Sequence, residues 1–234
     1  MRVTRNQRLL ALAGAVIVAA VVVAVAIAVG SSSKKASPTT IRTSTGASAG
    51  SFLTGVPQHG DTLGKAGAGA TLYVFEDPQC PYCREWSLNA LPTVVADFVK
   101  TRKVKLVWRG IEVIGPNSVL GLHAAYAAAQ QNKLWNMVEQ LYQRQGAENS
   151  GWITTSVLRQ AAAAAHVDTA KMLAALDSKA VTTKLKLAAE EAGAYGINGT
   201  PMLVVLRPPG LPRPVTVTGL DAASFSSDLN AALQ

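Results

Sequence analysis

The sequence predicts an α/β fold in which a mixed β-sheet is interrupted by an inserted block of helices, behind one N-terminal transmembrane helix. Three observations support this prediction. The N-terminus carries a long apolar run, two strand signals flank a helix signal in the first half, and two more strand signals and a helix follow an Ala-rich stretch without strand signal. A hairpin that follows a β–α–β unit gives a sheet of mixed strand direction.

The apolar run from Leu9 to Val29 contains 21 residues and no charged or polar side chain. As a helix rising about 1.5 Å per residue, it spans a hydrocarbon core of about 30 Å. Three arginines occur within residues 1–8, and basic flanks of this kind stay in the cytoplasm. The alternative is a cleaved signal peptide, but the apolar part of such peptides usually has about 7–15 residues. We therefore expect a single-pass anchor in the cell membrane, with the rest of the chain extracytoplasmic.

Residues 30–55 are predicted to form a flexible linker, because Ser, Thr, Ala and Gly dominate its first part without apolar periodicity. The chain carries a net charge of +8. Six of its 22 basic residues precede the first acidic residue, Asp61, which leaves 16 basic against 14 acidic residues. The domain at 56–234 is thus nearly neutral. It lacks a basic stripe with interleaved aromatic residues, so no nucleic-acid partner is expected.

The first half of this domain reads as strand, helix, strand. Residues 71–75 are a short apolar run of β-forming residues, and 104–109 are a second such run. Between them, apolar residues recur at helical spacing as far as about Lys100, and Pro92 should kink that helix.

The second half begins with a helical insertion at 117–195, which is Ala-rich and breaks into five periodic pieces. We expect helices at about 118–130, 132–145, 154–165, 168–177 and 180–194. Strand signal then returns at 202–206 and 214–218, and a last helix is expected at 221–233.

The chain has two cysteines, Cys80 and Cys83, which form a C-P-Y-C motif. A zinc site needs about four ligands, and the three histidines share no ligand spacing with the cysteines, so neither a metal nor another cofactor is expected. A structural disulfide is a second alternative. Closing so short a loop stabilises a fold by only roughly 2 kcal/mol, less than a long loop does. A redox dithiol is the favoured interpretation.

The position of the motif supports a redox role. It follows a strand and opens a helix, so Cys80 should lie at a helix N-terminus, where free N–H groups and the helix dipole favour the thiolate. Pro81 suits the first turn, because its missing N–H is not needed there. Cys83 lies one turn deeper. Cys80 is therefore expected to form a mixed disulfide with a partner sulfur, which Cys83 resolves.

The segment FEDPQCPYC, residues 75–83, resembles the F-x-D-x-x-C-P-Y-C signature of bacterial DsbA-like thiol:disulfide oxidoreductases, a branch of the thioredoxin superfamily. Residues 131–142 (QNKLWNMVEQLY) resemble the Q-x-x-K-x-W helix pair of that family's helical insertion, and 195–202 (YGINGTPM) resemble its G-[VI]-x-G-T-P segment. Together the matches extend over about residues 56–234 in the family's order. The resemblance implies a thioredoxin-like fold and thiol–disulfide exchange activity.

The resemblance also implies roles for particular residues. Pro81 and Tyr82 belong to the active-site motif. A cis Thr200–Pro201 bond should pack against the motif, which would leave the backbone of Thr200 free to pair with an extended substrate segment.

The proton-transfer acid is less certain from the sequence. Many relatives carry a buried acid six positions before the first cysteine, and Val74 occupies that position here. Glu76 and Asp77 lie nearer the motif and are the candidates to replace it. Asp77 is equally well explained as a turn-forming residue, so both assignments stay open.

The sequence thus predicts an extracytoplasmic protein disulfide oxidoreductase that acts on cysteine-containing exported proteins. A membrane redox partner would reoxidise or reduce its dithiol. An oxidase that donates disulfides is favoured over a reductase or disulfide isomerase. The alternative from another class is a membrane-tethered chaperone or binding module whose C-P-Y-C motif is dispensable.

Overall fold

The computed structural model describes residues 51–234, so the expected cytoplasmic N-terminus at 1–8, the anchor at 9–29 and most of the linker lie outside the described residues. Residues 51–55, which the sequence assigns to the linker, belong to the folded unit. Leu53 is buried there, and Ser51 Oγ donates a hydrogen bond of 2.7 Å to Glu139. Across the part of the chain that the structure describes, no helix is both long and apolar enough to cross a membrane.

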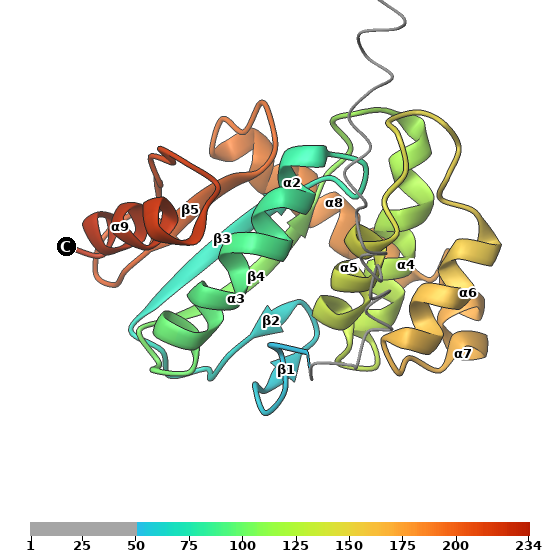
Figure 1. The fold of residues 1–234 in the computed structure, drawn as a ribbon, viewed down its shortest axis with the longest axis horizontal. Coiled ribbons are helices and arrows are strands. Elements are labelled where there is room, and N and C mark those ends of the chain that lie inside the picture. Colours follow the sequence, from blue (N-terminus) through green and yellow to red (C-terminus); the bar gives the residue numbers. More distant parts are fainter. Residues whose placement is uncertain (1–50) are drawn as a thin grey trace, which may run out of the picture. The chain divides into compact units, whose positions relative to one another are not determined.

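The centre of the fold is a six-stranded mixed sheet in the order β1-β2-β4-β3-β5-β6 (Figure 1). Strands β3 and β4 are parallel, whereas every other neighbouring pair is antiparallel. The mixed sheet predicted from the sequence is therefore confirmed. The strands are β1 (Gln58–His59), β2 (Thr62–Leu63), β3 (Ala70–Glu76), β4 (Val104–Gly110), β5 (Met202–Leu206) and β6 (Arg213–Pro214).

One expected strand, at 214–218, is much shorter than predicted. Only Arg213 and Pro214 pair with β5, as β6. Pro214 has no N–H to donate, and such residues are confined to the edges of sheets. Among the following residues, Val215 makes a single further backbone hydrogen bond, to Leu203, before the chain leaves the sheet.

The helical path after β3 is irregular around Pro92, where the sequence predicts a kink. It comprises α2 (Pro81–Glu85), the π-helical turn η1 (Trp86–Ala90), α3 (Leu91–Val94) and a second π-turn, η2 (Val95–Val99). Pro92 cannot donate the next hydrogen bond of the helical ladder. In the turn before it, the Leu91 N–H bonds to the carbonyl of Trp86, five residues back. The proline is therefore accommodated by a wider turn.

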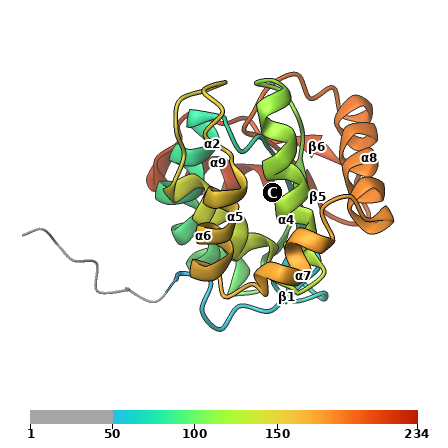
Figure 2. The same ribbon diagram turned by 90° about the vertical axis from the view of Figure 1, so that its right-hand side faces the viewer.

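The helical insertion has the five helices that the sequence predicts, with differences of a few residues at their ends. They are α4 (Val119–Ala129), α5 (Leu134–Gln143), α6 (Thr155–Ala164), α7 (Thr169–Ala174) and α8 (Lys179–Ala194), preceded by the short 3-10 helix η3 (Pro116–Ser118). Figure 2 shows α4 between α5 and α8. The last helix, α9 (Ala222–Ala232), packs beside α3 and η1, where Phe225 contacts Trp86 at 5.7 Å between ring centroids.

A buried ion cluster joins the sheet to this insertion. Arg109, on β4, is 6% exposed, and its Nη1 lies 2.7 Å from Asp61 Oδ2. From α8, Glu191 accepts from the same guanidinium and Lys184 Nζ lies 2.8 Å from Asp61. A buried charge is costly unless it is paired. The cluster therefore favours one arrangement of helix α8 against strand β4.

Candidate active site at the start of helix α2

The two cysteines lie at the start of helix α2, as the sequence predicts. Cys80 is the residue immediately before the helix, and Pro81 is its first helical residue. The N–H of Cys83 points back to the Cys80 sulfur, at 3.4 Å. Both cysteines are free thiols, 2% and 0% exposed, whereas Tyr82 between them is 62% exposed. Of the three residues, Tyr82 alone is exposed to solvent.

The surroundings of Cys80 favour its thiolate. A hydrogen bond from the Cys83 side chain is the main cause that lowers the Cys80 pKa, from 9.0 to about 6. Partial burial opposes the shift, and hydrogen bonds from the backbone N–H groups of Cys83 and Tyr82 add to it. The free N–H groups at a helix start supply just such donors. At neutral pH Cys80 is thus mostly ionised.

Cys83 has the opposite preference. Burial raises its pKa well above the ordinary value, and its hydrogen bond to Cys80 and the nearby charge of Glu76 raise it further. The pair therefore holds one thiolate and one thiol at neutral pH. This is the arrangement that thiol–disulfide exchange requires of an attacking and a resolving sulfur.

The segment 200–201 lies against this pair, although it is 120 residues away from Cys80 in the sequence. The Thr200–Pro201 peptide bond is cis, as the family resemblance implies. The Cys80 sulfur lies 3.2 Å from the carbonyl oxygen of Thr200. The motif and the Thr200–Pro201 segment therefore form one site.

Glu76, one of the two candidate acids, lies at the end of β3 and is completely buried. Successive strand residues alternate between faces. Glu76 therefore lies on the same face of β3 as Val74, and it is two residues nearer the cysteines than Val74 is. Its carboxylate accepts 2.7 Å hydrogen bonds from Ser87 Oγ and Trp108 Nε1. Burial raises the Glu76 pKa to about 8, even though these two hydrogen bonds lower it. The carboxyl group therefore keeps its proton at neutral pH.

Asp77, the other candidate, is also buried but holds the backbone in place. Its Oδ1 accepts hydrogen bonds from the N–H of Gln79 at 2.8 Å and from the hydroxyl of Ser118 at 2.6 Å. Its Oδ2 accepts from the N–H groups of Val113 and Ile114, at 2.8 and 2.9 Å. Both oxygens are thus occupied by donors that fix the turn before the motif. The geometry separates the two acids that the sequence leaves equivalent.

The helical insertion supports the motif through residues that sequence reasoning missed. Gln145 Nε2 donates to the carbonyls of Pro78 and Cys80, at 2.9 and 3.0 Å. The Tyr142 hydroxyl donates to the Asp77 carbonyl at 3.2 Å. Nothing in the sequence links Gln145 to the motif. Ser87, which donates to Glu76, was also missed, because the two residues lie 11 apart in the sequence.

A strand-to-helix dithiol with one low-pKa cysteine, a buried partner and a cis-proline segment defines a thiol–disulfide oxidoreductase of thioredoxin-like fold. Comparison with known sequences agrees. A family model described as thioredoxin matches residues 58–206. The chain belongs to the thioredoxin family.

Two curated relatives illustrate the similarity. The probable disulfide bond formation protein D of Bacillus cereus is 29% identical over 148 residues, which cover 62% of this chain and 68% of the relative. The thiol:disulfide interchange protein DsbG of Escherichia coli is 36% identical over 76 residues, which cover 32% of this chain and 29% of that protein.

Solved structures share the fold. Oxidised BdbD from Bacillus subtilis has a TM-score of 0.63 at 19% identity, over 76% of this chain and 97% of that one. A thioredoxin-like oxidoreductase from Silicibacter pomeroyi has a TM-score of 0.56 at 26% identity, over 76% and 91%. DsbA from Chlamydia trachomatis has a TM-score of 0.59 at 18% identity, over 73% and 88%.

Proposed function

We propose that this oxidoreductase is an extracytoplasmic oxidase that forms disulfides in exported proteins and is held at the cell membrane by residues 9–29. The observation that supports the direction is the Cys80 pKa of about 6. A stabilised thiolate lowers the free energy of the reduced enzyme, so the Cys80–Cys83 disulfide becomes a stronger oxidant. The apolar run with its basic flank supports the location.

The proposed reaction begins with the oxidised enzyme. A substrate thiolate attacks the Cys80 sulfur, the Cys80–Cys83 bond breaks, and its electron pair goes to the Cys83 sulfur. A second substrate thiolate then attacks the substrate sulfur of the mixed disulfide and expels Cys80 as a thiolate. The substrate loses two electrons, which the enzyme dithiol retains. A membrane redox partner then removes these electrons and regenerates the disulfide.

Glu76 is the proposed proton donor in the first step. The departing Cys83 sulfur needs a proton, because burial raises its pKa well above 9.0. Glu76 is neutral below a pH of about 8 and completely buried near Cys83. It is thus a proton source inside the core, close enough to Cys83 for its charge to raise the Cys83 pKa. In the reverse step the Glu76 carboxylate takes the proton back.

The substrate is proposed to bind as an extended segment. The Thr200 carbonyl lies 3.2 Å from the Cys80 sulfur, at the place where a substrate backbone would run alongside it. Main-chain pairing of this kind is independent of sequence. It suits an enzyme that acts on many exported proteins.

The direction of transfer is tested by the equilibrium of the purified protein with reduced and oxidised glutathione, and by oxidation of a reduced, unfolded substrate. We expect a reduction potential well above the thioredoxin value of about −270 mV. The reduced protein should also melt at the higher temperature. A potential near that of thioredoxin, with the oxidised form more stable, would identify a reductase instead.

One observation favours a second candidate function, disulfide interchange. The matched segment of the E. coli thiol:disulfide interchange protein is 36% identical over 76 residues, whereas the B. cereus relative is 29% identical over 148 residues. Refolding of a substrate with scrambled disulfides distinguishes interchange from oxidation. Interchange requires the reduced enzyme, whereas oxidation requires the enzyme with its Cys80–Cys83 disulfide. A Cys80→Ser variant that keeps full refolding activity would instead identify a chaperone with a dispensable motif.

A further inference from the structure

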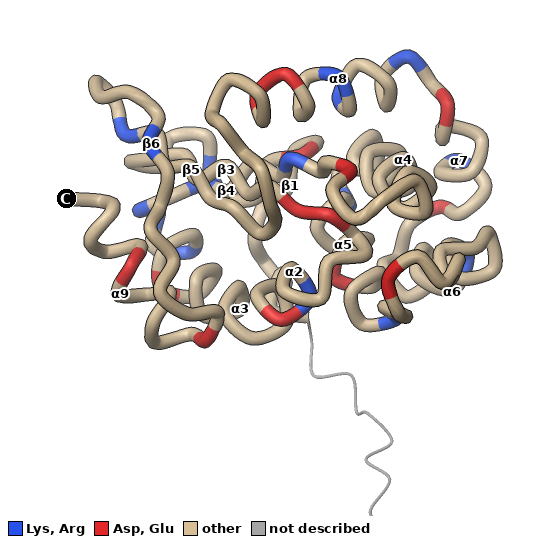
Figure 3. The backbone as a smooth tube through the Cα atoms, turned by 90° about the horizontal axis from the view of Figure 1, so that it is seen from above, with Lys and Arg blue, Asp and Glu red and all other residues tan. Residues whose placement is uncertain are grey.

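Basic side chains gather at the end of the sheet opposite the cysteines. Strands β3 and β4 begin there and β5 ends there, because Ala70 pairs with Val104 and Thr71 with Leu206. Cys80 follows the other end of β3. We call the exposed cations of this region the basic end: Lys65, Lys100, Arg102, Lys103, Arg207 and Arg213. Figure 3 shows basic positions collected around β3, β5 and β6.

No cation of the basic end forms an ion pair with a side-chain carboxylate among residues 51–234. The Lys103 ammonium lies 5.0 Å from the centre of the Phe98 ring, and Arg207 donates to the backbone carbonyls of Leu233 and Gln234. A neighbouring acid, Asp228, accepts hydrogen bonds from the N–H and hydroxyl of Thr218 and forms no ion pair with these cations. The positive charge of the basic end is therefore available to an external anion.

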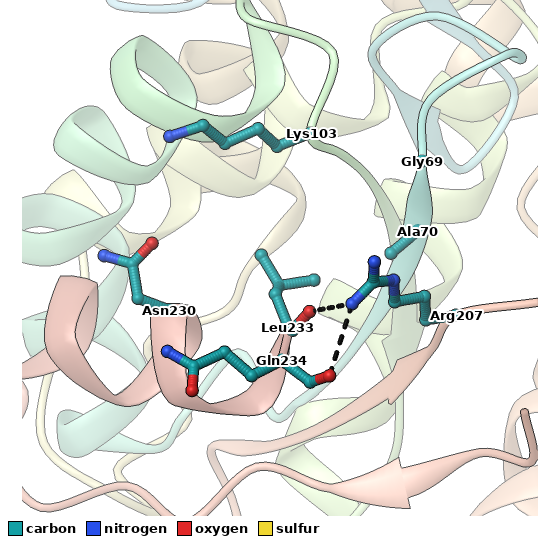
Figure 4. Close-up of a pocket in the computed structure, with 7 residues that line it drawn as sticks. All are labelled: Gly69, Ala70, Lys103, Arg207, Asn230, Leu233 and Gln234. Atoms are coloured by element: carbon teal, nitrogen blue, oxygen red, sulfur yellow. Dashed lines mark hydrogen bonds between the residues drawn. The ribbon is translucent and has the colours of Figure 1, made fainter.

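A cavity of about 470 Å³ opens within the basic end, between the starts of β3 and β4 and the end of α9. Figure 4 shows Lys103, Arg207 and the Asn230 amide around it. The loop that joins β5 to β6 carries Leu211, which is 86% exposed and lies between Arg207 and Arg213 in the sequence. Cations around an exposed apolar tip match a membrane interface, with its anionic headgroups outside and acyl chains beneath.

We propose that the basic end rests on anionic phospholipid headgroups, with Leu211 inserted among them. The inference adds an orientation to the proposed function and assumes its membrane location. Strand β3 has 7 residues, and at about 3.3 Å per residue it separates the two ends of the sheet by more than about 20 Å. A domain seated on its basic end therefore turns Cys80 away from the lipid, toward proteins that emerge into the extracytoplasmic space.

The test uses the full chain with Cys80→Ser and Cys83→Ser, so that Leu211→Cys is its only thiol and carries a fluorophore sensitive to polarity. The protein is reconstituted in vesicles of phosphatidylcholine alone or mixed with phosphatidylglycerol. We expect a blue shift and a gain in emission only with phosphatidylglycerol, reversed by concentrated NaCl, because salt screens surface charge. Each basic residue at such a surface changes the bound-to-free ratio about five-fold.

Charge reversal identifies the surface. Lys103→Glu with Arg207→Glu should lower the bound-to-free ratio at least about 25-fold, from two contributions of about five-fold each. Lys100→Glu with Arg102→Glu gives a second pair outside the cavity, in case the first disturbs α9. The matched control is Arg159→Glu with Lys179→Glu, which changes the net charge equally on exposed helices of the insertion and should leave the signal unchanged.

Two results would overturn the proposal: equal fluorescence in the two kinds of vesicle, or an equal loss in the control pair. Flotation with pure phosphatidylcholine tests the anchor separately, since neutral vesicles offer nothing to the basic end. The cysteine-free background also keeps the outcome independent of the redox chemistry. Failure of the membrane orientation is therefore distinct from failure of the proposed oxidase activity.

Discussion

Replacing Glu76 by Gln should stabilise the protein at neutral pH. The folded protein raises the pKa of this carboxyl group from 4.5 to about 8. Between these two values the folded state holds a proton that the unfolded chain has released. Stability therefore falls by about 1.4 kcal/mol per pH unit as the pH rises through this window, and none is lost below a pH of 4.5.

The size of the effect follows from the same interval. From pH 4.5 to pH 7 the loss adds up to about 3 kcal/mol. The amide of the Glu76→Gln variant does not titrate, so this loss disappears. The amide oxygen can accept from Trp108 Nε1, and Ser87 Oγ can reverse its role and accept from the amide nitrogen. Glu76→Gln should thus gain about 3 kcal/mol at pH 7 and nothing below pH 4.5, while thiol–disulfide exchange becomes slower.

The measurement is urea unfolding of the oxidised full-length protein in detergent, followed by Trp fluorescence across this pH range. The oxidised form is used because Cys80 and Cys83 then do not titrate. Since the Cys80 charge is one cause of the raised Glu76 pKa, the gain in the oxidised protein should be somewhat below about 3 kcal/mol. Asp77→Asn is the contrasting variant: it turns an amide toward backbone donors and should be destabilising. If the free energy of unfolding changed with pH in the same way in wild type and in Glu76→Gln, the Glu76 carboxyl group would ionise normally and the predicted stabilisation would be wrong.

Three further predictions follow from particular contacts. Titration of thiolate absorbance in the reduced protein should show a Cys80 midpoint near pH 6. Alkylation at pH 7 should label Cys80 before Cys83, and the reverse order would exclude Cys80 as the attacking thiol. Gln145→Ala removes two hydrogen bonds to backbone carbonyls near the motif, so thermal unfolding should report a loss of about 1–3 kcal/mol. Arg109→Ala removes the buried cation that Asp61 and Glu191 share and leaves Asp61 with the half-exposed Lys184 alone, so it should cost about 3–5 kcal/mol. Lys184→Ala leaves Asp61 paired with Arg109 and should cost less than about 1 kcal/mol; equal losses would contradict this account of the cluster.

Much of the fold was predictable, because its signals are local. The helices of the insertion show apolar periodicity within single segments, and the dithiol and its helix lie within one stretch of sequence. The shortened strand β6 was not predicted. Residues 214–218 have strand-like composition, but Pro214 and the position at the sheet edge limit pairing, and the edge position depends on the whole topology.

The candidate site was only partly predictable, for a related reason. The sequence identifies Cys80 and Cys83 by their spacing, yet it leaves Glu76 and Asp77 equivalent because they are adjacent. Their difference arises from distant partners: Trp108 is 32 residues from Glu76, and Ser118 is 41 residues from Asp77. Contacts at such separations are set by how strands and helices assemble, which periodicity along one segment does not report.

The burial of Cys80 has a consequence for timing in the cell. With 2% of its surface exposed, the sulfur is reachable only by a thin, pliable piece of polypeptide. A cysteine within a finished globular domain cannot extend far enough from its surroundings to arrive there. For the proposed oxidase, the client would therefore be oxidised while it is still unfolded, soon after it emerges from the membrane. Under this condition the order in which cysteines emerge, rather than their stability as pairs, decides which disulfides form first.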